Sequence, residues 1–230
     1  MHIARVPSRE LMDDELPASD LAVVLDDLWR INRWFGGVSG GMRLLDRFFL
    51  RTGVHPVRVL DVGAGDGRLA ARLTERLRRQ GVKFVVLDRR VSHLRHGQGA
   101  SGAPGRVAAD VLSLPFQPAS FDVVMCNLFL HHFSGGRAEE MLGALVGIAG
   151  EAVLINDLDR RWLPYFLIRH ARLLARHPIS RLDGAASVHQ AYTRDELLRL
   201  ARQVRAEKCE FVKLPFFRHG LILWKVRVAT

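Results

Sequence analysis

The chain has 230 residues, of which 48% are hydrophobic and 25% are charged, an ordinary balance for a globular protein. This length suits one well-buried α/β domain with small additions and excludes two large domains. The formal net charge of +10 favours contact with nucleic acid or membrane headgroups, although arginines scattered over solvated helix faces would account for it equally well.

The two cysteines and the amino-terminal residues indicate the compartment. Cys126 and Cys209 have neither the spacing of a disulfide framework nor that of a zinc site, so we expect free thiols and predict no metal site. The amino-terminal residues lack an apolar signal core, and no charge-free run approaches the ~20 residues of a membrane span. The sequence therefore predicts a cytoplasmic protein.

Two helices are predicted first. Apolar residues recur at helical spacing over residues 21–35, after Pro17 and with Ser19 or Asp20 as the capping residue. The pair Gly36–Gly37 should end this helix, and a second helix is predicted over residues 42–51.

Strands and helices then alternate. Five strands are predicted over residues 57–63, 83–88, 106–110, 121–130 and 151–157, with helices over 67–80 and 138–150. After a helical stretch, a helix over 193–204 has Thr193 as its capping residue. Strands over 209–216 and 221–228 are joined by Arg218–His219–Gly220, a connection short enough for a hairpin. This order predicts an α/β fold: a seven-stranded, mostly parallel Rossmann-like sheet with one antiparallel strand and a helical cap.

A glycine-rich corner, VRVLDVGAGDGRLA, joins the first strand to its helix. Its glycines are Gly63, Gly65 and Gly67, whereas a dinucleotide fingerprint requires its last glycine at the position of Arg68. Asp61 would repel a pyrophosphate at this turn and attract a cationic ammonium or sulfonium group. The pattern therefore favours S-adenosylmethionine over NAD.

Acidic residues also end the next two predicted strands. Asp88 could accept hydrogen bonds from both ribose hydroxyls, and Asp110 from the adenine amino group. Each of them alone could equally be a turn or cap residue. Because open α/β sheets bind ligands at the carboxyl ends of their strands, acids at three successive strands point to one nucleoside site.

Four motifs, VLDVGAGDGRLA, VVLDRR, AADVLSLPF and FDVVMCNLFLHHF, resemble successive motifs of the class I S-adenosylmethionine-dependent methyltransferases. The segments LPF, FDVV and LHH resemble the small-molecule branch that includes quinone-biosynthesis methyltransferases. The segments LMDDELP, INRWFGG, LFLHHF and VLIND resemble methyltransferases of bacterial polyketide and phenolic-lipid pathways.

The resemblance implies a division of the chain and a set of cofactor contacts. Residues 1–54 would form an amino-terminal helical cap, 55–157 the cofactor-binding core, 158–190 a second cap segment, and 191–230 a helix and hairpin that complete the core. Asp61 and the glycine turn would face the methionine part of S-adenosylmethionine, and Asn127 would lie under the cofactor. Arg89 departs from the family pattern, in which an apolar residue often covers the adenine at this position, and an arginine can stack there instead. The implied contact residues are Asp61, Gly63, Ala64, Gly65, Gly67, Asp88, Arg89, Asp110, Val111 and Asn127.

Methyl transfer to a hydroxyl requires removal of its proton, and a histidine suits this task for a phenol of pKa ~10. His131 and His132 follow the fourth strand beside the expected donor, and we prefer His132 as the base. Asp157 and His189 are the other candidates. For each of these residues a structural role is the alternative.

The acceptor class is narrowed by motifs that the chain lacks. At the end of the fourth strand the chain reads NLFL, rather than the Asn/Asp-Pro-Pro-aromatic motif of adenine amino-methylation. Methylation of cytosine at carbon 5 needs a nucleophilic cysteine, usually beside a proline, but Cys126 precedes Asn127 and should point into the sheet as a small apolar residue. The sequence therefore favours O-methylation, or less strongly C-methylation, of an aromatic, polyketide-like or lipophilic small molecule. An RNA methyltransferase and a non-catalytic S-adenosylmethionine-binding protein remain alternatives, and the oligomeric state stays open.

The segment RRWLPYFLIRHARLLARHPISRL separates the fifth strand from the last helix. Apolar residues (Leu163, Phe166, Leu167, Leu173 and Leu174) and arginines (Arg169, Arg172 and Arg176) recur on two sides at helical spacing. Such a helix either lies on an anionic membrane surface or packs on its own domain. With the first helix it should roof an apolar pocket beside Asn127 and His132, lined by Trp34, Phe35, Trp162, Tyr165 and Phe166.

Overall fold

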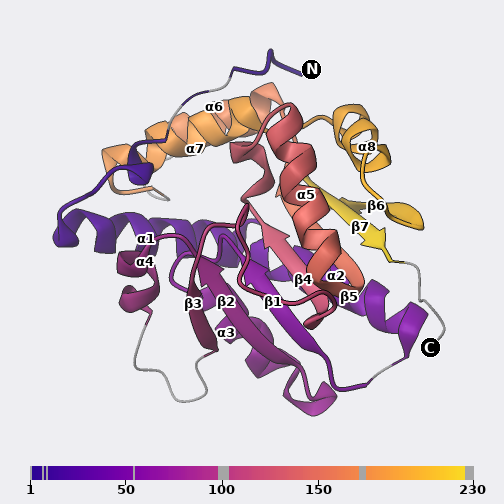
Figure 1. The fold of residues 1–230 in the computed structure, drawn as a ribbon. Coiled ribbons are helices and arrows are strands. Elements are labelled where there is room, and N and C mark those ends of the chain that lie inside the picture. Colours follow the sequence, from indigo (N-terminus) through magenta and orange to yellow (C-terminus); the bar gives the residue numbers. More distant parts are fainter. Residues whose placement is uncertain are drawn as a thin grey trace.

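The computed structural model describes residues 2–6, 8, 10–53, 55–97, 104–170 and 175–225. Within these residues a seven-stranded sheet has the order β3-β2-β1-β4-β5-β7-β6 (Figure 1). Its strands are β1 (Arg58–Val62), β2 (Lys83–Asp88), β3 (Gly105–Ala108), β4 (Phe121–Asn127), β5 (Ala149–Leu158), β6 (Lys208–Leu214) and β7 (Arg218–Trp224). In the described sheet six strands run in the same direction and β7 runs antiparallel to them, so the predicted fold class is confirmed.

Helices cover both faces of the sheet. On one face, α2 (Gly37–Thr52) and α3 (Arg68–Arg76) pack against residues such as Val59 and Val123. On the other, α5 (Gly136–Ile148) and α8 (Arg194–Arg202) pack against residues such as Leu60 and Val124. Neighbouring strand residues point to opposite faces, so two covered faces require the continuous apolar runs that β1 and β4 carry.

Another group of helices lies above the carboxyl ends of the strands (Figure 1). They are α1 (Ala18–Trp34), α6 (Trp162–His170) and α7 (Pro178–Gln190), together with the short 3-10 helix η1 (Leu11–Asp13). Two further 3-10 helices, η2 (Arg78–Gln80) and η3 (Leu130–His132), and the short helix α4 (Val91–His96) lie in the connections between strands. Arg172, Leu173 and Leu174, which were predicted to continue α6, lie outside the described residues. None of the helices in the described ranges has both the length and the apolar character needed to cross a bilayer.

The corner between α1 and α2 differs from the prediction. Gly36 ends α1 in a left-handed conformation, with φ of 89°, but α2 begins at once, at Gly37, rather than at residue 42. A Cβ on Gly40 would lie 2.7 Å from the Asn156 amide nitrogen, so this glycine permits a close contact with β5 instead of breaking the helix. α2 consequently packs in the core and is not part of the cap.

Three other details were mispredicted. A short helix, α4 (Val91–His96), follows β2 where no helix was expected, because its six residues are too few for a periodic signal. α1 begins at Ala18 with Pro17 at the N-cap, so neither Ser19 nor Asp20 caps it. Residues 218–220, predicted as the hairpin connection, belong to β7 and pair with the end of β5. The turn lies instead between Leu214 and Arg218, with Phe216 and Phe217 at positive φ.

The cap of α8 gives a direct test of local energetics. The Thr193 hydroxyl accepts the Glu196 N–H, and the Glu196 side chain accepts the Thr193 N–H, which forms a capping box. We expect Thr193→Ala to lower the free energy of unfolding by about 1 kcal/mol. The matched variant Ser19→Ala, at a position that caps nothing, should change it by less than ~0.5 kcal/mol in chemical denaturation. Equal losses in the two variants would contradict the cap assignment.

Candidate active site

A cavity of about 780 Å³ lies at the carboxyl ends of the strands. The strand order reverses between β1 and β4, and ligands of open α/β sheets bind at such a switch point. The cavity floor comes from the residues that follow β1, β2, β3, β4 and β5, and its roof from η1, α1, α6 and α7. Its volume falls within the ~300–1,000 Å³ of small-molecule sites.

The glycine turn after β1 forms one wall of the cavity. Gly63, Gly65 and Gly67 have φ of 64°, 57° and 79°, which favours glycine at each position. Gly63, Ala64 and Gly65 line the cavity, whereas Gly67 precedes α3 and faces Val86 of β2. A Cβ on Gly63 would lie 2.3 Å from the ring of Phe129, so this glycine also makes room for the loop after β4.

Two carboxylates stand close together beneath and beside this turn. Asp61 is buried below the cavity wall and is not itself among the lining residues, and its Oδ1 has no hydrogen-bond partner among the described residues. Burial, with the negative charge of Asp88 as the second cause, raises the pKa of Asp61 to about 7. Asp88 accepts the Gly65 N–H at 2.9 Å and the Arg90 N–H at 2.8 Å, and it lines the cavity.

This pair of acids suits a ligand that carries both a positive charge and hydroxyl groups. An ammonium group near Asp61 would supply its missing partner and offset the repulsion between the two carboxylates. The carboxylate of Asp88 has lone pairs beyond the two that its backbone bonds use, and these can accept ribose hydroxyls. The residues that are present therefore fit the methionine and ribose parts of S-adenosylmethionine.

The adenine side of the predicted site is more open. Arg89, Asp110 and Val111 all line the cavity, and Val111 is buried. Asp110 lies two residues beyond the end of β3 rather than within it, and its Oδ1 accepts the Leu112 N–H at 2.9 Å. The sequence missed His93, a buried wall residue, because α4 was not recognised.

Three asparagines connect the sheet edge to the corner between α1 and α2. Asn156 donates to the Asn127 carbonyl at 2.6 Å and to the Gly36 carbonyl at 3.2 Å, and Asn127 donates to Asn32 at 3.2 Å. Asn127, one of the predicted cofactor contacts, and Asn32 both line the cavity. Asn32 and Asn156 were missed, because their partners come from distant parts of the chain.

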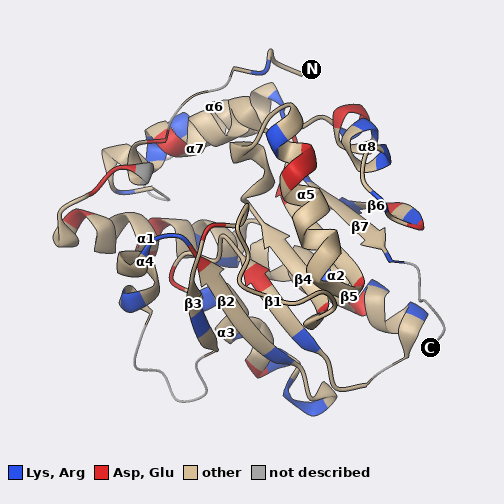
Figure 2. Cartoon of the chain, in the orientation of Figure 1, with Lys and Arg blue, Asp and Glu red and all other residues tan. Residues whose placement is uncertain are grey.

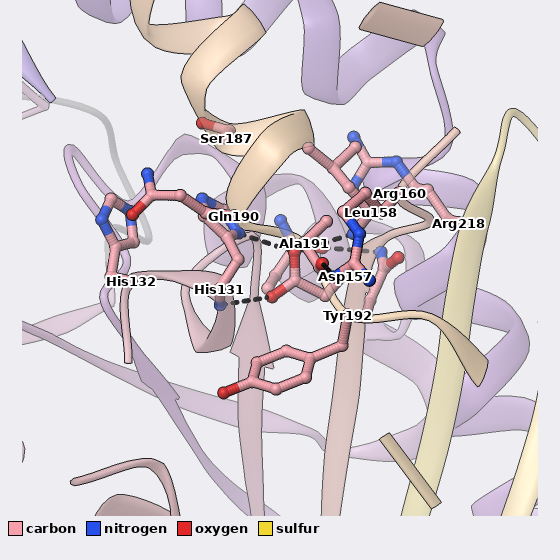
Figure 3. Close-up of polar contacts among 12 residues, drawn as sticks. His131, His132, Asp157, Leu158, Arg160, Ser187, Gln190, Ala191, Tyr192 and Arg218 are labelled. Carbon is pink, nitrogen blue, oxygen red and sulfur yellow. Dashed lines mark hydrogen bonds and ion pairs between the residues drawn. The ribbon is translucent and has the colours of Figure 1, made fainter. Parts of the chain in front are cut away.

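His131 lies between two buried carboxylates. Its Nδ1 is 2.7 Å from Asp157 Oδ1, and its Nε2 is 3.6 Å from Glu10 Oε1; Figure 3 shows the Asp157 side of this arrangement. Burial disfavours the charged imidazolium, but Asp157 and Glu10 outweigh that effect and raise the pKa of His131 to about 10. His131 is therefore a proton-bearing structural residue at neutral pH.

Asp157 is committed to the same arrangement. It also accepts the backbone N–H groups of His131 and Leu158, at 3.0 and 2.7 Å, and it does not line the cavity. Burial would raise the pKa of Asp157, yet the charge of His131 holds it below its usual value. The geometry thus places Asp157 as a support for His131 rather than as a base facing an acceptor.

His132 is the partly exposed member of the pair and faces the cavity. Its ring stacks on that of His131 at 4.5 Å, and its Nε2 lies 3.8 Å from Glu10 Oε2. Glu10 also accepts the Ser187 hydroxyl at 2.6 Å. The sequence missed Glu10 entirely; it predicted no group of metal-ligand types, yet here Glu10, His131 and His132 bring such atoms within 4.8 Å of one another.

The predicted aromatic lining is correct for one residue of five. Phe35 lines the cavity, but Trp34 is 63% exposed, and neither it nor Trp162, Tyr165 or Phe166 reaches the cavity wall. The reason is that α1 and α6 are each rotated about their own axes relative to the prediction, so that other side chains face the cavity. α1 contributes Leu28, Trp29 and Ile31 instead, and α6 contributes Pro164, Leu167 and Ile168.

Comparisons with known proteins agree with this geometry. A family model described as a methyltransferase domain matches residues 59–148. An uncharacterised methyltransferase of Mycobacterium tuberculosis is 41% identical over 101 residues, which cover 43% of this chain and 49% of the relative. The O-methyltransferase xanE of Aspergillus fumigatus is 30% identical over 173 residues, covering 69% of this chain and 39% of the relative. The chain thus spans about half the length, or less, of these curated relatives.

Solved structures share the fold at low identity. The plantazolicin methyltransferase BpumL, in complex with S-adenosylhomocysteine, has a TM-score of 0.67 at 13% identity, over 91% of this chain and 96% of that one. An S-adenosylmethionine-dependent methyltransferase from Aquifex aeolicus has a TM-score of 0.62 at 15% identity, over 92% and 100% of the two chains. At these identities the likeness shows the fold alone.

The first prediction for the site concerns Asp88. We expect Asp88→Ala to weaken S-adenosylmethionine binding by ~1–3 kcal/mol, because two charge-assisted hydrogen bonds to the ribose would be lost. Isothermal titration calorimetry measures this. Asp46→Ala, which removes an exposed acid on α2, should bind the cofactor as the wild type does. Unchanged binding in Asp88→Ala, or tight binding of NAD to the wild type, would contradict the assignment.

The second prediction for the site concerns the pH dependence that Asp61 imposes. Because its folded pKa of about 7 lies above its ordinary value of 3.8, this carboxyl stabilises the fold at low pH and loses that contribution as pH rises through 7. Without ligand, Asp61→Asn should therefore be more stable than the wild type at pH 8, by ~1–3 kcal/mol, and similar to it at pH 5.

The same substitution should weaken S-adenosylmethionine binding at pH 8, since the ammonium group loses its carboxylate. Chemical denaturation and calorimetry at the two pH values give both quantities. A variant that is less stable than the wild type at pH 8 would show that the ionised carboxyl is satisfied within the protein.

Proposed function

We propose, from the premise that the chain carries a class I S-adenosylmethionine-dependent methyltransferase domain, that it methylates an aromatic, polyketide-like or lipophilic small molecule, at oxygen rather than carbon. The premise combines the matched methyltransferase domain with the fold of the solved methyltransferases. The acceptor and the methylated atom are the proposal.

The donor occupies the side of the cavity next to β1 and β2 in this proposal. Asp61 holds the amino group of the methionine part, Asp88 the ribose, and Val111 one side of the adenine. When bound there, S-adenosylmethionine supplies an activated methyl group. The residues of the chain orient that group toward the other half of the cavity and keep water from it.

The acceptor half of the cavity lies between the loop after β4 and the cap. Its wall includes the apolar side chains Phe35, Phe129, Phe133, Leu158, Phe216 and Phe217. An apolar acceptor with an aromatic ring would bury its surface against them. The similarity to the O-methyltransferase xanE of Aspergillus fumigatus supports transfer to oxygen.

The assignment of the two histidines carries the proposal for catalysis. His131 already holds a proton between Glu10 and Asp157, so it is not available to take another. His132 lines the cavity next to it, and the Glu10 carboxylate lies close enough to stabilise the imidazolium that forms when His132 takes a proton. We therefore assign to His132 the role of the base that takes the acceptor's proton, and to Glu10 the role of orienting the His132 ring.

The test compares His132→Ala with His96→Ala, an exposed histidine at the end of α4 that does not line the cavity. A panel of phenols, including long-chain alkylphenols, identifies an acceptor through release of S-adenosylhomocysteine. With that acceptor, His132→Ala should lower turnover by ~10²–10⁴-fold while cofactor affinity stays unchanged. His96→Ala should retain both. A loss below tenfold in His132→Ala would mean that the site acts by alignment alone, and no turnover of any acceptor would favour a non-catalytic binding protein.

A further inference from the structure

The helix α6 presents its apolar side to solvent. Trp162, Leu163, Phe166 and Leu167 are 53%, 39%, 46% and 51% exposed. A helix on the surface of a globular protein ordinarily turns its apolar side inward and its polar side to water. Four large apolar side chains in a single short helix therefore form an exposed patch that has a cost in water, and this patch is here called the outer face of α6.

These four residues lie next to one another on the helix. They occupy positions one, two, five and six of α6, and residues four apart are neighbours on a helix surface. The rings of Trp162 and Phe166 stack at 5.6 Å with an angle of 20°. The outer face is therefore one continuous surface rather than a set of isolated side chains.

The other side of α6 is fully used by contacts within the chain. Tyr165 packs edge-on against His189 of α7 at 4.6 Å. Ile168 packs on Gly184 of α7 so closely that a Cβ there would lie 2.6 Å from it. Turning the helix to bury its outer face would break these contacts, so the exposed orientation is fixed by packing.

The outer face continues to the edge of the cavity. Leu167 is half exposed and also lines the cavity. Phe216 and Phe217, in the turn between β6 and β7, likewise line the cavity and are 51% and 37% exposed. Leu167 therefore belongs both to the outer face and to the cavity wall.

The charges around the outer face favour an anionic partner. Exposed arginines, Arg161 and Arg169, stand at the two ends of α6, which has no acidic residue (Figure 2). Arg161 pairs with Asp159, whereas Arg169 makes no hydrogen bond or ion pair with any described residue. With a net charge of +10 on each chain, two copies meeting through this face would repel each other.

We propose that the outer face of α6 docks on the surface of an anionic lipid bilayer. The four apolar side chains would enter the boundary between headgroups and acyl chains, and Arg161 and Arg169 would remain at the level of the phosphates. A bilayer accommodates such side chains without a complementary shape. The docking itself is independent of the proposed function.

The experiment measures binding of the full chain, with S-adenosylhomocysteine present, to sedimenting vesicles. Vesicles of phosphatidylglycerol mixed with phosphatidylcholine are compared with vesicles of phosphatidylcholine alone. We expect binding to the anionic vesicles that weakens as salt is added. Trp162→Ser with Phe166→Ser, and separately Arg169→Glu, should each weaken it about tenfold or more.

The matched control is Leu50→Ser, because Leu50 is the most exposed large apolar residue in the described part of the chain but lies on α2, away from the cap. This variant should bind the vesicles as the wild type does. Melting temperatures and cofactor affinity must match the wild type in every variant, which separates loss of docking from loss of the fold or of the donor site.

Two results would overturn the proposal. One is a wild-type chain that stays in the supernatant with anionic vesicles at low salt. That result would also be found if the outer face instead joined two copies of the chain or bound an acidic protein, and in either case the proposal is wrong. The other is equal binding by the wild type, the Trp162–Phe166 double variant and Arg169→Glu. Neither result affects turnover of a water-soluble phenol, so failure of docking and failure of the proposed function are distinguishable.

Discussion

The buried row of Glu10, His131 and Asp157 is the interaction on which the arrangement of the site depends. Two carboxylates buried without partners would each be expensive. The imidazolium of His131 is hydrogen-bonded to Asp157 and lies 3.6 Å from Glu10, so it attracts both carboxylates, although its single charge offsets only one of them. Asp157 belongs to β5, His131 to the loop after β4, and Glu10 to the amino-terminal segment. The row therefore links the amino-terminal segment to the sheet edge, and it leaves His132 as the more exposed of the two histidines that line the cavity.

The amino-terminal segment is held beside the histidines by further hydrogen bonds to α7 and to the loop after β4. The Asp183 carboxylate accepts the N–H groups of Leu11 and Met12, each at 2.8 Å, and Arg5 donates to the Phe133 carbonyl at 2.9 Å. These bonds satisfy backbone groups that an irregular segment would otherwise leave unpaired. They also explain why a residue so far from the histidines in sequence can act as their partner.

On the donor side of the cavity, by contrast, one oxygen of a buried carboxylate has no hydrogen-bond partner among the described residues. Asp61 is buried near another acid and lacks a partner on one oxygen, so the unliganded fold is less stable than its packing would allow. Sites that bind charged ligands commonly keep such strain, because the ligand relieves it. On the cap side each carboxylate has a hydrogen-bond donor within the protein, whereas on the cofactor side one oxygen of Asp61 is left without one in the described part of the chain.

The sequence alone determined the sheet, the cofactor corner and the type of cofactor. Those features follow from local patterns: apolar runs of strand length, glycines that permit positive φ, and acids at successive strand ends. It could not find Glu10, Asn32 or Asn156, because their roles are contacts across long separations that no local pattern encodes.

It also misplaced Trp34, Trp162 and Phe166, since periodicity shows that a helix has two sides but not which side faces the cavity. Only the tertiary structure decided that rotation, because the packing of Tyr165 and Ile168 on α7 turns the aromatic side of α6 outward. In the same way, only the packing of His131 between two carboxylates separated two adjacent histidines that are equivalent in the sequence.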